Sequence, residues 1–120
     1  MLRLVTDSHV PPAVAKAARK LAGLEITPLR DWHGGQYLNE SDARLLALAW
    51  QDRVTLVTYD LNTFPLSVKE RLEEGLSHAG MIYVSARYRQ NDVGGIARGL
   101  LKLWRAERHQ DWINRIRFLE

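Results

Sequence analysis

The sequence lacks cysteine, which excludes disulfides, thiolate metal sites and cysteine nucleophiles. It has no apolar run near the roughly 20 residues that span a lipid bilayer. Its first residues do not combine a basic stretch with a long apolar segment, as a signal peptide would. We therefore expect a soluble cytoplasmic protein with no membrane association. Its 120 residues suit one domain, over residues 1–120.

The composition is that of a globular protein with a mildly basic surface. Hydrophobic residues make up 46% and charged residues 26% of the chain, enough for a packed core. Lysine and arginine total 17 against 14 acids, a net charge of +3, and the excess lies in the last third. This basic region could attract a polyanion. On charge alone, a solvated helix face is the simpler interpretation.

Short apolar runs rich in β-branched residues alternate with longer runs of helical periodicity. The expected strands lie at 2–6, 24–29, 54–58 and 80–84, and the expected helices at 11–21, 42–51, 66–76 and 92–108. Residues 112–119 could form a final strand or a helical tail, and the strand is favoured. In the third of these helices, Val68, Leu72 and Leu76 are expected to form one apolar face. The alternation predicts a three-layer α/β/α fold with a central, mostly parallel sheet of four to five strands.

Three aspartates occupy related places in this pattern. Asp7 directly follows the first expected strand, and Asp60 closely follows the third. Asp42 opens the helix that leads into the third strand, directly after Ser41, a favourable helix N-cap. In parallel sheets the active crevice lies at the carboxyl ends of the strands. We therefore expect the three carboxylates to meet at one edge.

Carboxylates crowded in this way favour a hard divalent cation, which relieves their mutual repulsion. Mg²⁺ or Mn²⁺ there could activate water and neutralise charge on a phosphate. Asn62 offers a further oxygen ligand near Asp60, and the hydroxyls of Ser8 and Thr58 could support the site or contact phosphate.

Each aspartate also has an ordinary structural interpretation. Asp42 could simply favour the positive end of a helix dipole. Asp60 could close an Asx turn, and Asp7 could cap the following helix. Any one of them alone is better explained structurally, so the functional hypothesis depends on their expected convergence.

Four segments together resemble small PIN-like proteins. Residues 4–15 place an acid at a strand end before a proline, and residues 41–49 open a helix with an acid. Residues 55–64 combine a strand, a threonine, an acid and a phenylalanine, and residues 80–84 form a strand before a long helix. The resemblance covers nearly the whole chain, although each motif is short.

The resemblance implies a PIN-like fold and a Mg²⁺- or Mn²⁺-dependent ribonuclease related to VapC-type toxins. It makes Asp7, Asp42 and Asp60 metal ligands and RNA the substrate, and it leaves open an antitoxin partner and a homodimer. Two positions depart from the pattern: Ser8 stands where relatives carry a second acid, and Asn62 where a fourth acid often lies. These changes imply weaker metal binding, a single metal ion, or lost catalysis.

Three further residues are candidates for substrate contacts. His9, close to Asp7, could contact phosphate or transfer a proton, and Arg87 and Arg89 follow the fourth strand, where arginine could hold a phosphate. Ordinary surface roles are equally compatible with all three. Two other functions are considered: a binding module that has lost catalysis, and a receiver-like phosphoacceptor. A receiver-like phosphoacceptor would carry a lysine after a late strand, whereas this chain has Ser-Ala-Arg after its fourth expected strand.

Overall fold

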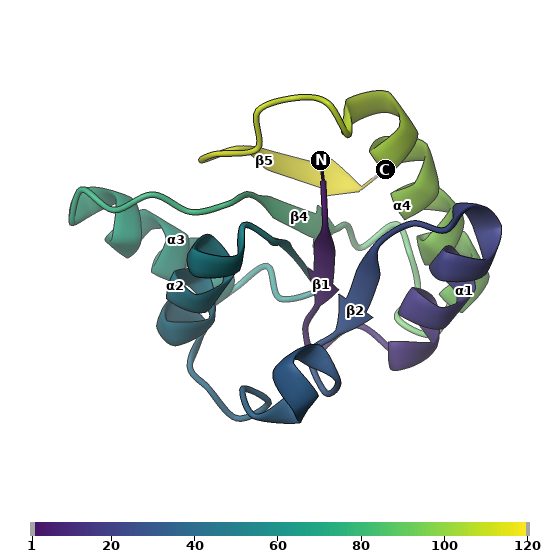
Figure 1. The fold of residues 1–120 in the computed structure, drawn as a ribbon, viewed down its shortest axis with the longest axis horizontal. Helices are drawn as coiled ribbons and strands as arrows, with labels where there is room; N and C mark the ends of the chain where they lie inside the picture. The colour runs from purple at the N-terminus through teal and green to yellow at the C-terminus, as the bar shows by residue number, and fades with distance from the viewer. Residues whose placement is uncertain (1, 120) are drawn as a thin grey trace.

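Five parallel strands form one sheet in the computed structural model, which describes residues 2–119 (Figure 1). The strands are β1 Leu4–Thr6, β2 Ile26–Pro28, β3 Thr55–Thr58, β4 Met81–Val84 and β5 Ile116–Leu119. The helices are α1 Pro12–Ala22, the 3₁₀ helix η1 Trp32–Gly35, α2 Asp42–Asp52, α3 Phe64–Glu73 and α4 Val93–Glu107. The strand order is β2-β1-β3-β4-β5, and every neighbouring pair is parallel. The predicted α/β class is confirmed.

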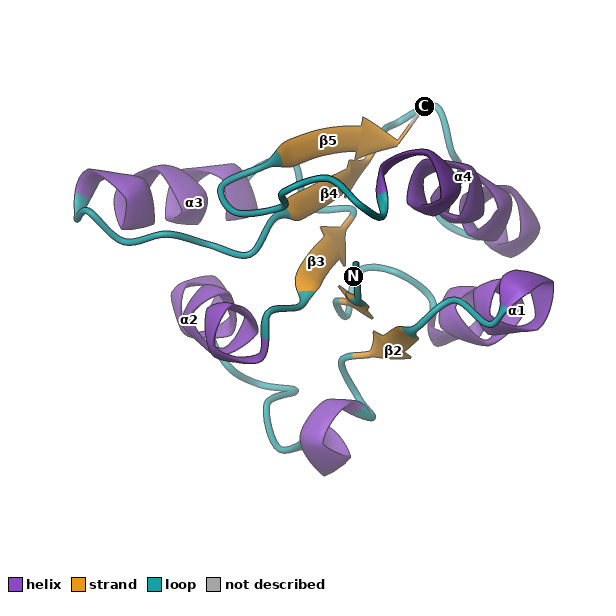
Figure 2. Cartoon of the chain, turned by 45° about the horizontal axis from the view of Figure 1, so that its top comes forward, coloured by secondary structure: helices purple, strands orange, loops and turns teal. Residues whose placement is uncertain are grey.

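Helices cover both faces of the sheet. Helices α1 and α4 pack together on one face, and α2 and α3 lie on the other (Figure 2). Successive strand residues therefore enter different hydrophobic clusters: Leu4 and Val57 face α1 and α4, whereas Val5 and Leu56 face α2. This alternation explains why the strands read as continuous apolar runs rather than as alternating ones.

The order of the strands reverses next to β1. The chain passes from β1 to β2 on one side and then returns to place β3 on the other side of β1. In open parallel sheets, the connections leave in opposite directions at such a point and open a crevice at the carboxyl ends of the two strands. The crevice here lies where β1 leads into Asp7 and β3 leads towards Asp60.

Local sequence signals set the ends of the helices that frame this crevice. The side chain of Ser41 accepts a hydrogen bond from the N–H of Arg44 at 3.2 Å, so Asp42 is the first residue of α2, as predicted. Asp92 caps α4 in the same way, accepting from the N–H of Gly95 at 3.0 Å. Helix α1 ends at Ala22, and the following Gly23, with a φ of 63°, forms the left-handed C-cap.

Helix α3 differs from the prediction. It begins at Phe64, two residues early, and its buried residues are Phe64 and Val68. Leu72 and Leu76 are 42% and 46% exposed, so the predicted continuous apolar face is wrong. The far end of α3 extends away from the strands (Figure 2), and Leu72 lines an open groove with Val68 and with Ile116 of β5 rather than a closed core.

Strand β5 is held to α4 by charge as well as by backbone pairing. Glu107, at the end of α4, forms ion pairs with Arg115 and Arg117, the second at 2.9 Å. The side chain of Glu107 is only 11% exposed. The strand predicted over residues 112–119 is present but begins only at Ile116, and this ion-paired cluster joins it to α4. None of the helices within residues 2–119 combines the length and apolar character needed to cross a bilayer.

Candidate functional site

Asp7 lies just past β1 and is almost completely buried, with 4% of its surface exposed. Its N–H donates to the carbonyl of Val57 at 2.9 Å, which extends the β1–β3 pairing by one residue. One carboxylate oxygen accepts from the N–H of His9 at 3.0 Å, and the other accepts from the Thr58 hydroxyl. Asp7 therefore has defined partners and points to the β1–β3 junction rather than into solvent.

The environment of Asp7 disfavours its charge. Burial raises the pKa of Asp7 to about 6, and the negative charge of Asp42 adds to this effect. Hydrogen bonds from Thr58 and from the His9 N–H, together with the charge of His9, oppose the rise without cancelling it. A buried carboxyl group with a raised pKa beside a second acid is typical of functional sites.

Asp60 follows β3 and closes an Asx turn, as its structural interpretation predicts. One carboxylate oxygen accepts from the N–H groups of Asn62 and Thr63, both at 2.9 Å. Burial favours a higher pKa for Asp60, but the hydrogen bonds from Thr63 and Asn62, with the charge of His9, lower it below its usual value. Asp60 is thus an ionised carboxylate.

Thr63 brings the carboxylates of Asp42 and Asp60 together. Its hydroxyl oxygen lies 3.0 Å from Oδ2 of Asp42 and also within hydrogen-bonding distance of Oδ2 of Asp60. A threonine hydroxyl has one proton, so it can donate to only one of the two carboxylates at a time. The other carboxylate needs a further donor or a positive charge.

Two threonines thus connect the three aspartates. The hydroxyl of Thr58 donates to Asp7 and accepts from the N–H of Asp60 at 2.9 Å, and Thr63 connects Asp60 to Asp42. The three aspartates therefore lie along one hydrogen-bonded chain, in which only the carboxylates of Asp42 and Asp60 share a donor. Sequence reasoning missed Thr63. Its signal was the Asx turn itself, which aims the residue three positions after Asp60 back towards that carboxylate.

A groove of about 500 Å³ opens beside Asp60. Its walls include His9, Asn62 and Thr63. The charge of His9 acts on both Asp7 and Asp60, so its exposed imidazole lies near both acids. The side chain of Asn62 is exposed on this wall, whereas Ser8 is exposed outside the groove.

The loop after β4 carries the predicted arginines. Both Arg87 and Arg89 are exposed. Arg87 lines a second groove of about 540 Å³ together with Asp92 and Lys102. Gln90 of this loop donates to the carbonyl of His9 at 2.8 Å, which joins the arginine loop to the segment that follows Asp7. The two arginines therefore flank the edge that holds the aspartates.

Tyr83, in β4, is a second site residue that sequence reasoning missed. It is 2% exposed, and its hydroxyl forms no hydrogen bond within the described part of the chain. Burial raises the pKa of Tyr83 to about 12, and the negative charges of Asp60 and Asp42 add to the rise. The phenol is therefore a neutral hydrogen-bond donor, and the charges of both carboxylates act on it.

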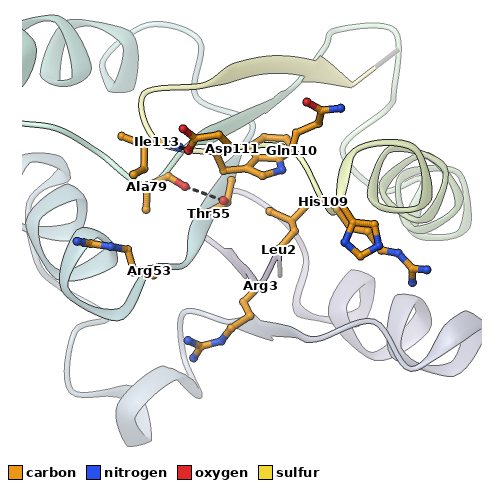
Figure 3. Close-up of a pocket in the computed structure, with 11 residues that line it drawn as sticks. Leu2, Arg3, Arg53, Thr55, Ala79, His109, Gln110, Asp111 and Ile113 are labelled. Carbon is orange, nitrogen blue, oxygen red and sulfur yellow. Dashed lines mark hydrogen bonds between the residues drawn. The ribbon is translucent and has the colours of Figure 1, made fainter.

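A separate pocket of about 500 Å³ lies at the opposite edge of the sheet, before β1, β3 and β4 begin. Figure 3 shows Arg3 and Arg53 on one side of this pocket and His109 on the other. Its arginines are engaged by the protein. Arg3 pairs with Glu25 at 2.7 Å, and Arg53 stacks over the Trp50 ring at 3.5 Å. None of the site residues predicted from the sequence lines this pocket.

The oxygen donors of the aspartate site match the preference of Mg²⁺ and Mn²⁺. Among residues 2–119, however, no three Asp, Glu or His side chains stand close enough to hold a metal ion together. Mg²⁺ commonly uses one or two carboxylates and keeps several water ligands. The pair Asp42 and Asp60, with one hydroxyl proton between them, fits that mode of binding. A cage built from all the predicted ligands is not formed.

Comparison with known proteins finds no match to this chain among protein families, curated proteins or solved structures.

Proposed function

We propose that this protein is a Mg²⁺- or Mn²⁺-dependent ribonuclease with a PIN-like fold. One observation carries the proposal: three aspartates from separate segments, connected by two threonines, meet at the crevice of a parallel sheet. The site is acidic, whereas the adjacent loop after β4 exposes arginines. An acidic centre beside cations suits a metal-assisted reaction on a phosphodiester.

A cation bound at this site would polarise the phosphate and lower the pKa of a water molecule. Asp42 and Asp60 would hold it, because their carboxylates share one hydroxyl proton and are exposed enough to reach an ion. Asp7 would stabilise the site indirectly, because the Thr58 hydroxyl that donates to Asp7 also accepts from the N–H of Asp60. Asn62 sits on the groove wall and offers a neutral oxygen.

The surrounding residues suit RNA binding. Arg87 and Arg89 would hold backbone phosphates, since a guanidinium matches a phosphate with two hydrogen bonds. His9, exposed between Asp7 and Asp60, would contact the scissile phosphate or move a proton. We place this activity in the cytoplasm. A toxin–antitoxin role, with an antitoxin partner and a homodimer, is a further proposal that rests on the resemblance alone.

The alternative is a PIN-like module that binds RNA or protein without cleaving. One observation favours it: no three acidic or histidine side chains within residues 2–119 are arranged to hold a metal ion. Ser8 and Asn62, which replace acids expected from the resemblance, agree with this alternative. It predicts binding that is insensitive to chelator.

Calorimetric titration of Mn²⁺ tests the proposal directly. We expect saturable binding to the wild-type protein and loss of binding in Asp42→Asn and Asp60→Asn. Asp111→Asn is the matched control, because Asp111 is exposed at the opposite edge of the sheet and should bind Mn²⁺ like the wild type. Cleavage of a mixed RNA pool, with and without chelator, then tests the chemistry.

The outcomes separate the two functions. Mn²⁺ binding with chelator-sensitive cleavage supports the ribonuclease. A wild-type protein that binds no Mn²⁺, yet binds RNA in chelator, would replace it with the binding module.

A further inference from the structure

Tyr83 belongs to a row of residues that crosses the sheet on the α2–α3 face. Thr58 of β3 pairs with Tyr83 of β4, which pairs with Phe118 of β5. On the other side of Thr58 lies Asp7, bound to its hydroxyl. Residues that are paired in register on neighbouring parallel strands point their side chains to the same face of the sheet. The phenol of Tyr83 is therefore held on the face where Asp7 and Thr58 meet.

The ring of Tyr83 is firmly packed. It belongs to the cluster formed with Val5, Phe64 and Val68, and the Phe118 ring lies over it with the centroids 5.4 Å apart. A ring fixed in this way cannot turn its hydroxyl to bulk water. The position of the O–H group is thus set by the sheet rather than by a hydrogen bond of its own.

The hydroxyl nevertheless has no partner within residues 2–119. Leaving a buried donor unpaired costs stability, so a buried tyrosine usually finds a partner. The nearby charges belong to Asp60 and Asp42, both of which act on the phenol. The register also places Tyr83 beside Thr58, whose hydroxyl accepts from the N–H of Asp60 at 2.9 Å. An unused donor in this row suits a ligand that brings its own oxygen atoms.

We propose that Tyr83 is a positioning residue, whose O–H donates a hydrogen bond to a hydration water of the divalent cation held by Asp42 and Asp60. This inference rests on the proposed function, because it requires the cation. The partly hydrated ion that the site suits would carry such waters. Hydrogen bonds from outside the ligand set tune metal affinity, and their loss commonly weakens binding by about tenfold or more.

Tyr59 provides a matched control. Its hydroxyl is also buried and unpaired among the described residues, but it packs against the cluster on the opposite face of the sheet. The charge that acts on it is that of Asp92, not those of Asp42 and Asp60. Tyr59 also lines the groove beside Asp60, but its hydroxyl is buried against the opposite face of the sheet. Tyr59→Phe thus removes a buried hydroxyl without removing the Tyr83 donor.

The experiment compares wild type, Tyr83→Phe and Tyr59→Phe in two measurements. In chelator, both variants should unfold at the wild-type temperature or above it, because each loses an unsatisfied buried hydroxyl. In calorimetric titration with Mn²⁺, Tyr83→Phe should bind about tenfold more weakly, whereas Tyr59→Phe should match the wild type. A purely structural tyrosine would not separate the two variants in this way.

Each remaining outcome overturns the inference in a distinct way. Equal Mn²⁺ affinity of Tyr83→Phe and wild type would remove the role of Tyr83 and leave the proposed function intact. Absence of Mn²⁺ binding in the wild type would remove both. A lower unfolding temperature of Tyr83→Phe in chelator would mean that the phenol already has a partner in the protein, which also excludes the proposal.

Discussion

At the scale of single residues, Asp7 destabilises the fold that it helps to organise. Its pKa of about 6 in the folded protein lies above the ordinary value of 3.8. The folded state therefore binds this proton more tightly than the unfolded state does. Stability contributed by the protonated group is complete below about pH 4 and is lost as the pH rises through about 6. Above this pH, the ionised carboxylate lowers the free energy of unfolding by about 3 kcal/mol.

Asp7→Asn should remove this pH dependence. In chelator, we expect the variant to match the wild type near pH 4 and to exceed its free energy of unfolding by about 1–3 kcal/mol near pH 8. Urea unfolding at both pH values measures the difference. Asp111→Asn, at an exposed position, should show no such trend. A stability difference for Asp7→Asn that does not change with pH would contradict the raised pKa.

Residue-scale reasoning from sequence located the aspartates but not their connections. Asp7 and Asp60 could be predicted because each follows a strand, and the ends of parallel strands share one edge. The Asx turn after Asp60 held a signal for Thr63, but its contact with Asp42 depends on how α2 packs beside that turn. Tyr83 could not be predicted, since its place depends on which residues pair between β3 and β4. Register across strands is a tertiary property that local sequence does not determine.

At the scale of elements, local sequence predicts the starts of α2 and α4 but not the buried face of α3. The starts of α2 and α4 are encoded locally by Ser41 and Asp92, which cap them. The face of α3 depends instead on how far the sheet extends beneath it. Leu72 shares the helical spacing of Val68 yet is 42% exposed, because helical periodicity shows which residues align but not what covers them.

The link between α4 and β5 should depend on Glu107. Its carboxylate receives Arg115 and Arg117, which are partly exposed at 32% and 48%. Glu107→Gln leaves two arginines without their counter-charge, and we expect a loss of about 2 kcal/mol in the free energy of unfolding. Urea unfolding measures the loss. Relative to the wild type, amide hydrogen exchange should accelerate more in β5 than in β1.

Glu73→Gln is the matched control for this prediction. Glu73 pairs with Lys69 on the surface of α3 at 3.9 Å, with both side chains more than half exposed. Such a pair contributes less than about 0.5 kcal/mol. If the two glutamate variants lost equal stability, the buried ion-paired cluster would not be what holds β5 in place.

At the scale of the whole molecule, two hydrophobic clusters share a single sheet. Trp104 and Trp112 belong to the cluster on the α1–α4 face, and Trp32 belongs to the cluster on the α2–α3 face. Each strand supplies alternate residues to both clusters, as Leu56 and Val57 do in β3. Loss of either cluster would leave the strands exposed to water on one side, so neither face should survive alone.

We therefore expect the described fold to melt in a single transition. Fluorine NMR of fluorotryptophan-labelled protein gives each face its own signal, and the signals of Trp32, Trp104 and Trp112 should disappear with one midpoint. Calorimetry should give an enthalpy of about 80 kcal/mol near about 60 °C, equal to the van't Hoff value. Melting of Trp32 clearly before Trp104 and Trp112 would show that the α2–α3 face, which carries the aspartate site, opens as a separate unit. The site would then be mobile under conditions in which the other face stays folded.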